Sequence, residues 1–86
     1  MLVAYIQAAM RHATYEILDD GSYYGEIPDC QGLWANAATL ESCRDELQSG
    51  LEGWIILGLR MNHTLPVVEG IDLNPKPEQG ATEAAA

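Results

Sequence analysis

Five acidic side chains lie close together in the first third of the chain and are the residues best suited to chemistry. They are Glu16, Asp19, Asp20, Glu26 and Asp29. Carboxylates that converge on one point can hold two metal ions for phosphodiester hydrolysis. However, Asp19, Asp20 and Asp29 fall in predicted turns, where Asp is common for backbone reasons alone. Only Glu16 and Glu26 lie inside predicted strands, so the sequence favours interpreting these acids as turn and surface residues.

Other catalytic or metal-binding arrangements find no support in the sequence. Ser22, Ser42 and Ser49 have no nucleophile motif around them. His12 and His63 stand alone, without a partner at metal-ligand spacing. Each is expected near the C-terminal end of a helix, where the helix dipole favours a cation. We therefore expect no catalytic residue, no metal site and no cofactor.

The two cysteines do not form a C-x-x-C pair. Cys30 is expected in a loop and Cys43 in the helix that follows it. A disulfide between them would require a geometry that the sequence does not show. The favoured interpretation is two reduced thiols, with Cys43 as a small core residue.

Composition restricts the possible partners. The chain has 86 residues, which suits one small domain, and 13 acidic against 4 basic side chains give it a net charge of -9. That charge opposes binding to nucleic acid, whose phosphates require Lys and Arg. It suits a basic protein partner, although it also has the simpler role of maintaining solubility. The sequence lacks a membrane-spanning apolar stretch and a basic signal-peptide start, so we expect a cytoplasmic protein.

A helix and three strands are predicted in the first half of the chain. Residues 1–12 form an amphipathic helix, with an apolar stripe of Leu2, Val3, Ile6, Ala9 and Met10. The period then changes to that of a strand over residues 14–18, and Asp20-Gly21 indicates a hairpin turn. A return strand over residues 23–27 ends at Pro28, and residues 33–37 form a third strand.

A long helix from Leu40 to about Met61, capped by Thr39, is the main predicted core element. Its core stripe is Leu40, Cys43, Leu47, Leu51, Trp54 and Gly58. Ile56 and Leu59 fall on the opposite side, which either the first helix or another subunit must cover. This second apolar side and the open edge of the sheet predict a homo-oligomer.

The end of the chain is predicted to add one more strand and then a tail. Residues 67–73 are rich in β-branched side chains and are expected to pair in parallel with the first strand through a right-handed crossover. Residues 74–86 contain almost no apolar bulk and predict a disordered tail. The expected fold is therefore α+β, one domain over residues 1–73 in which the short helix precedes a β-β-β-α-β core.

The run Tyr-Tyr-Gly-Glu-Ile-Pro-Asp-x-x-Gly-x-Trp-Ala over residues 23–35, followed by Thr-Leu-Glu-x-Cys over 39–43, resembles the HicB-like antitoxins. The resemblance covers roughly residues 14–73. It implies a truncated RNase H-like fold. It also implies a function: binding and inhibiting a small basic RNA-cleaving toxin of the HicA type.

Many HicB-like proteins add a C-terminal DNA-binding segment, whereas this sequence continues past Leu73 only with a short low-complexity tail. We therefore expect no direct contact with nucleic acid. The contact set expected for the toxin is Tyr24, Glu26, Asp29 and Trp34, because aromatic rings supply rigid area and acids meet Arg or Lys. The alternative is an orphan homo-oligomeric module that binds another protein or a small ligand near Trp34 and Tyr24. A degenerate hydrolase is a third, weaker hypothesis.

Overall fold

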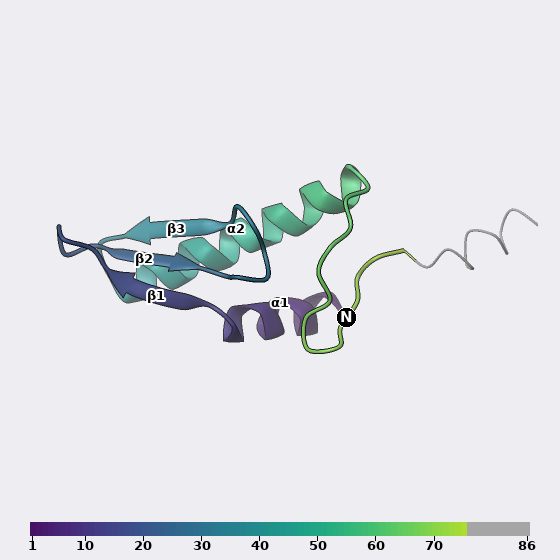
Figure 1. Ribbon diagram of the computed structural model, residues 1–86, viewed down its shortest axis with the longest axis horizontal. Coiled ribbons are helices and arrows are strands. Elements are labelled where there is room, and N and C mark those ends of the chain that lie inside the picture. The colour runs from purple at the N-terminus through teal and green to yellow at the C-terminus, as the bar shows by residue number, and fades with distance from the viewer. Residues whose placement is uncertain (76–86) are drawn as a thin grey trace, which may run out of the picture.

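The chain folds into a helix, a three-stranded sheet and a long helix (Figure 1). The computed structural model describes residues 1–75. The elements in chain order are α1 (Leu2–Arg11), β1 (Thr14–Ile17), β2 (Tyr23–Glu26), β3 (Trp34–Ala37) and α2 (Leu40–Arg60). The α+β class is confirmed, and all five elements lie where the sequence predicts them.

The sheet is an antiparallel meander in the order β1-β2-β3. The turn between β1 and β2 uses Gly21 at φ +84°, a left-handed conformation that glycine adopts without penalty. In the middle strand, Gly25 is buried opposite Tyr15. A Cβ atom at Gly25 would lie 2.9 Å from the Tyr15 ring and 3.1 Å from the Cys43 sulfur. The missing side chain therefore lets the Tyr15 ring lie across the centre of the sheet.

Both ends of α2 have defined caps. The Thr39 hydroxyl accepts a hydrogen bond from the Ser42 amide at 3.0 Å, as the sequence predicts. At the other end Asn62 adopts φ 58°, and the His63 amide donates to the Gly58 carbonyl at 2.8 Å. This is the Schellman arrangement, in which a left-handed residue ends the helix.

The core lies mainly between α2 and strands β2 and β3. The buried residues of α2 are Cys43, Leu47, Leu51, Ile55 and Gly58. The predicted stripe is thus corrected at two positions. Leu40 is exposed, and Trp54 is half-buried at the margin of the core, where its indole Nε1 donates to the Gln31 carbonyl at 3.2 Å. Ile55 is buried instead, in one cluster with Leu65 and Val68 of the segment after α2.

The buried face of α1 also differs from the predicted stripe. Tyr5, Ala8, Ala9 and Met10 are buried, whereas Leu2 and Val3 are exposed. Tyr5 explains the rotation, because its hydroxyl donates to the Pro66 carbonyl at 2.6 Å. Burial raises the pKa of Tyr5 to about 12, so the phenol remains a donor at physiological pH. The segment after α2 therefore determines which side of α1 faces inward.

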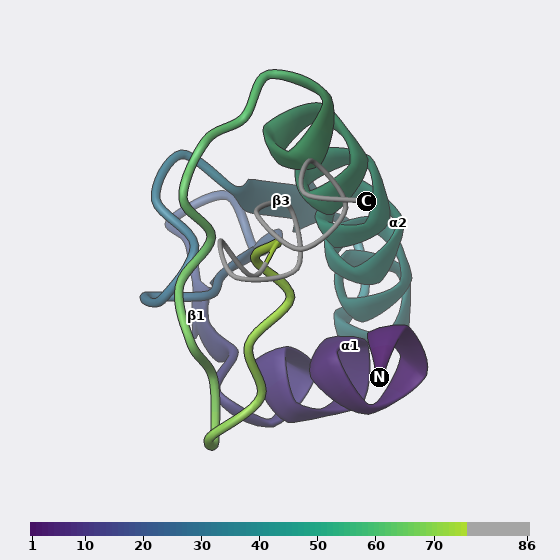
Figure 2. The same cartoon turned by 90° about the vertical axis from the view of Figure 1, so that its right-hand side faces the viewer.

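The predicted fourth strand over residues 67–73 is wrong. This segment does not join β1 but turns back on itself, with Val68 and Ile71 exchanging backbone hydrogen bonds of 3.1 and 2.8 Å. Glu69 at φ 50° and Gly70 at φ 79° form the turn, and a chain reversed there cannot extend along a neighbouring strand. Figure 2 shows this segment crossing from the end of α2 to α1, on the side of the molecule away from α2.

The hairpin after α2 is closed by a side chain. Asn74 accepts from the Leu65 amide at 2.7 Å and donates to the Leu65 carbonyl at 2.8 Å, as a paired strand residue would with its backbone. Leu65 and Val68 are buried against the core. Asn74, which the sequence assigns to the predicted tail, is thus part of this hairpin. Residues 76–86 of the predicted tail lie outside the described residues.

No segment of the described part of the chain covers the second apolar side of α2. Ile56 is 56% exposed and Leu57 is 58% exposed, although α1 also packs against α2. The sequence predicts that either the first helix or another subunit covers Ile56, and the structure excludes the first helix. Ile17 on β1 is also exposed, because α2 packs over β2 and β3 only.

Candidate functional site

Within residues 1–75, no second layer covers one face of the sheet, and this face carries most of the predicted contact residues. Side chains alternate between the faces of a strand, and those directly opposite each other on paired strands share a face. The register places Thr14, Glu26 and Trp34 in one cross-strand row. It places Glu16, Tyr24 and Asn36 in the next. These six residues, turned away from α2, are named the outer sheet face.

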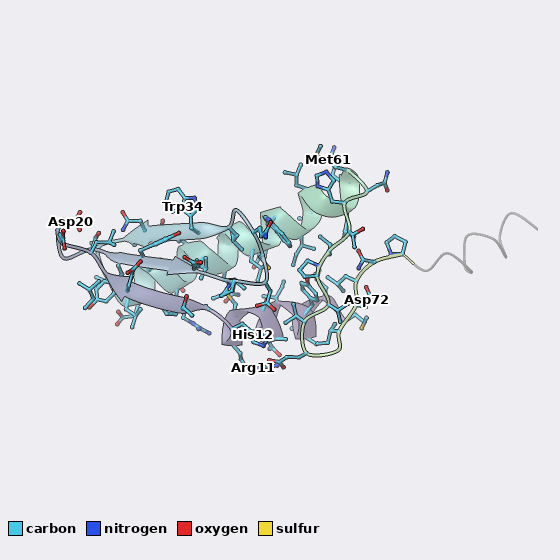
Figure 3. All side chains as sticks on the ribbon, viewed as in Figure 1. Arg11, His12, Asp20, Trp34, Met61 and Asp72 are labelled. Atoms are coloured by element: carbon cyan, nitrogen blue, oxygen red, sulfur yellow. The ribbon has the colours of Figure 1, made fainter. Side chains whose placement is uncertain are left out.

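Two aromatic rings form the centre of this face. The rings of Tyr24 and Trp34 lie with their centroids 6.0 Å apart and their planes tilted by 36°. This separation is within the range of stabilising aromatic pairs. Trp34 nevertheless remains 59% exposed on the edge strand β3 (Figure 3). A large aromatic ring that is held in place and still faces solvent is typical of a contact surface.

Two shallow hollows flank this aromatic pair. The first, of about 250 Å³, lies between the sheet and the loop from β2 to β3, and Tyr24, Glu26 and Trp34 line it together with Pro28 and Gln31. The second, of about 230 Å³, lies toward β1. It is lined by Thr14, Tyr15, Glu16, Tyr24 and Glu26. Tyr24 and Glu26 therefore line both hollows.

The outer sheet face is acidic. Partial burial raises the pKa of Tyr24, and the negative charges of Glu26 and Glu16 raise it further. Glu26, which also forms a hydrogen bond with the Tyr24 phenol, and Glu16 therefore both act on this ring. No Lys or Arg is among the six residues of the face. The face thus offers hydrogen-bond acceptors and aromatic surface but no cation.

Asp29, the fourth residue of the predicted contact set, lies in a different environment. Its carboxylate is 3.1 Å from Nδ1 of His12, the C-cap residue of α1. The other ring nitrogen of His12 is 3.0 Å from Glu69, which also holds Arg11 at 2.6 Å. Figure 3 shows Arg11 and His12 side by side at the end of α1. This cluster of Arg11, His12, Asp29 and Glu69 is named the histidine clamp.

The histidine clamp joins three segments that are distant in sequence: the end of α1, the loop after β2 and the hairpin after α2. The two carboxylates favour the doubly protonated ring, because only the imidazolium can donate from both nitrogens. The hydrogen bond to Asp29 is the largest cause that raises the pKa of His12 above its ordinary 6.5. Arg11 chiefly holds the pKa of Glu69 below its ordinary 4.5. The sequence predicts His12 at a helix end but gives no sign of these partners.

We expect the stability of the fold to decrease as the pH rises above 6.5. The folded pKa of His12 is raised, so its contribution is complete below the unfolded pKa and is lost as pH rises through the folded pKa. Because the folded pKa of Glu69 is lowered, its contribution is lost at the acidic end, below its ordinary 4.5. The measurement is the urea midpoint as a function of pH. His12→Gln, which does not titrate, should remove the decline above pH 6.5; an unchanged decline would contradict this role.

Asp20 and the two cysteines occupy structural positions. Asp20 accepts from the Ser22 amide at 2.9 Å and from its hydroxyl at 2.6 Å, which is the backbone role predicted for a turn Asp. Within residues 1–75, no group of three or more His, Cys, Asp or Glu side chains is placed to hold a metal ion. Cys30 and Cys43 are both free and buried. Burial raises the pKa of Cys30 to about 11, which keeps it a protonated thiol.

The structure thus brings together three of the four predicted contact residues and separates the fourth. Tyr24, Glu26 and Trp34 share the outer sheet face, whereas Asp29 belongs to the histidine clamp. Three further residues, Thr14, Glu16 and Asn36, also lie on this face but were not in the predicted contact set. Strand alternation alone places all three of them there. None of the helices in the described part of the chain is long and apolar enough to cross a membrane.

Comparison with known proteins places the chain in a family. A family model described as UPF0150-like matches residues 4–66. The crystal structure of TTHA0281 from Thermus thermophilus is similar, with a TM-score of 0.80 and 37% sequence identity. The match covers 87% of this chain and 94% of TTHA0281. A search of curated proteins found no match.

Proposed function

Because this chain belongs to the UPF0150-like family, which is related to HicB-like antitoxins, we propose that it is an antitoxin-type inhibitor. In this proposal it binds a small basic RNA-cleaving protein of the HicA type and does no chemistry itself. The β-β-β-α part of the chain would then be a truncated RNase H-like core whose next strand is replaced by the local hairpin after α2.

The observation that carries the proposal is the uncovered outer sheet face. Tyr24 and Trp34 present aromatic area there, and Glu16 and Glu26 lie beside them with no cation on the same face. A net charge of -9 favours encounter with a basic protein, because opposite fields accelerate association. The same charge disfavours direct binding to RNA or DNA. Charge and surface therefore both suit a basic protein as the partner.

RNA cleavage in the presence of the partner tests this proposal. The partner to use is a small basic protein encoded beside the gene for this chain. Its RNA cleavage should fall to background when one equivalent of this chain is added, and this chain alone should cleave neither RNA nor an RNA–DNA hybrid. Cleavage by this chain that Glu26→Gln abolishes would replace the inhibitor with a hydrolase. A partner that keeps its full activity at excess inhibitor would contradict the proposal.

A homo-oligomeric binding module without a toxin is the second candidate. The observation that favours it is the exposed apolar side of α2 formed by Ile56, Leu57 and Leu59. An apolar side of this kind, uncovered in the monomer, is usually covered in an assembly. Self-association is compatible with both functions. The apolar side of α2 and the outer sheet face lie on opposite layers of the molecule, so an assembly through α2 leaves the sheet face open.

We expect Ile56→Asp to shift the assembly toward monomer. An Asp on the covered side of α2 would bury a charge without a partner, which is costly. The measurement is light scattering at micromolar concentration. Ser49→Asp is the control, because it adds the same charge about two turns earlier on α2 without removing an apolar side chain. A monomer mass for the unmodified chain, or equal masses for both variants, would contradict self-association through this side.

A further inference from the structure

The outer sheet face combines groups that recognise one particular cation. A guanidinium group stacks on aromatic faces and also donates two parallel hydrogen bonds to a carboxylate. Trp34 and Glu26 are cross-strand neighbours, directly opposite each other on β3 and β2. Both line the same hollow of about 250 Å³ together with Tyr24. An exposed indole face and a carboxylate are thus held next to each other at the margin of one hollow.

No cation of the described part of the chain lies on this face. Arg11 is bound to Glu69 in the histidine clamp. Arg44 and Arg60 lie on α2, the layer behind the sheet. The charges of Glu16 and Glu26 are therefore not offset by a base on their own face. Because no base of residues 1–75 completes this face, another molecule is inferred to bring the cation.

We propose that the outer sheet face is an arginine-binding site for a basic protein partner. The guanidinium group of the partner lies over the Trp34 ring and donates to the carboxylate of Glu26. Tyr24 holds the Trp34 ring by the tilted contact of 6.0 Å, and Glu16 adds negative charge from β1. The proposal rests on the proposed function, to which it adds the chemistry that the partner must present.

Arginine fits this face better than lysine. An ammonium group is a compact and strongly hydrated charge, whereas guanidinium is flat and more weakly hydrated, so it loses less water when it covers an indole ring. The hollow is open and shallow, which suits a flat group better than a deeply inserted one. We therefore expect arginine, lysine and neutral citrulline to bind in that order of decreasing affinity.

Three short peptides test the site without the partner. They are acetyl-Gly-Arg-Gly-amide and its lysine and citrulline equivalents. The readout is the indole N–H signal of Trp34 in a ¹H–¹⁵N spectrum, assigned by its loss in Trp34→Phe. The indole of Trp54 is an internal reference, because its Nε1 is already bonded to the Gln31 carbonyl. The arginine peptide should shift the Trp34 signal saturably and the Trp54 signal much less.

The expected size of the effect follows from the two contacts. Citrulline keeps the shape of arginine but not its charge, and it should bind at least about tenfold more weakly. Glu26→Gln should weaken arginine binding several-fold, and Glu52→Gln on α2 should leave it unchanged. Trp34→Leu, in which binding is followed by the backbone amide signals of β2 and β3 because the indole is absent, should also weaken it several-fold. Equal binding of arginine and citrulline, or equal binding by Glu26→Gln and the unmodified chain, would overturn the arginine site.

The outcome separates the site from the proposed function. If the peptides do not discriminate but the basic partner is still inhibited, the arginine site is wrong and the inhibitor function stands. If arginine binds selectively but the RNA-cleaving partner is unaffected, the arginine site stands. The protein that brings the arginine is then not an RNA-cleaving toxin.

Discussion

Leu47→Ala is expected to lower the free energy of unfolding by about 2–5 kcal/mol. Leu47 is fully buried in the middle of α2, which packs over β2 and β3. Truncation there removes apolar contacts and leaves a cavity that the sheet cannot fill, because its strands are fixed by their register. Such a loss is a large fraction of the stability of a small domain.

Urea unfolding monitored by circular dichroism measures this effect. The matched control is Gln48→Ala, which truncates the next residue of the same helix at an exposed position. A surface change of this kind is expected to alter stability by less than about 0.5 kcal/mol. A loss for Leu47→Ala no larger than that of the control would mean that the core is not built around this face of α2.

Glu26→Lys is expected to have the largest effect on partner binding. The substitution removes the carboxylate from the outer sheet face and places a cation beside Trp34, where the partner is proposed to bring its own. Loss of one member of a buried charge pair costs about 2–5 kcal/mol, which corresponds to at least about a thirtyfold loss of affinity. The measurement is the concentration of this chain that halves RNA cleavage by the partner.

Glu52→Lys is the matched control for that variant. Glu52 is exposed on α2, in the layer behind the sheet. Both substitutions raise the net charge by two from -9, so they weaken long-range attraction of a basic partner equally. A difference between them therefore reports local contact. Equal losses for the two variants would mean that general acidity, and not the outer sheet face, determines inhibition.

Local signals were sufficient to predict most of the fold. The change of period at Thr14, the Asp20-Gly21 turn and the Thr39 cap each depend on residues adjacent in sequence. Each of these features is found in the structure. Alternation within strands likewise places Tyr24 and Glu26 on one face. Where the conformation depends on neighbouring residues, the pattern and the structure agree.

Predictions that depended on distant partners were wrong. The β-branched residues after Pro66 favour a strand, but the left-handed conformations of Glu69 and Gly70 turn that segment into a hairpin. The only local sign of this turn is Gly70, because Glu rarely adopts a positive φ. The hairpin is also closed by the side chain of Asn74, which bonds to the Leu65 backbone where a paired strand would use its own backbone.

Two further differences follow from that hairpin. Tyr5 turns inward because Pro66 supplies its hydrogen-bond acceptor, so the buried side of α1 is rotated from the predicted stripe. Asp29 was grouped with the contact residues by its charge alone. In the structure it bonds to His12, whose second nitrogen lies beside Glu69 of the hairpin. Neither pairing has a periodic pattern in sequence, so neither could be predicted from one.

The outer sheet face is proposed to bind the basic partner, and a spectrum of the complex shows whether it does. The most direct measurement is the ¹H–¹⁵N spectrum of this chain with one equivalent of that partner added. We predict that the indole signal of Trp34 and the amide signals of β2 and β3 change, whereas the amide signals around Ile56 on α2 do not. Changes confined to α2, with the Trp34 indole signal left in place, would contradict the account.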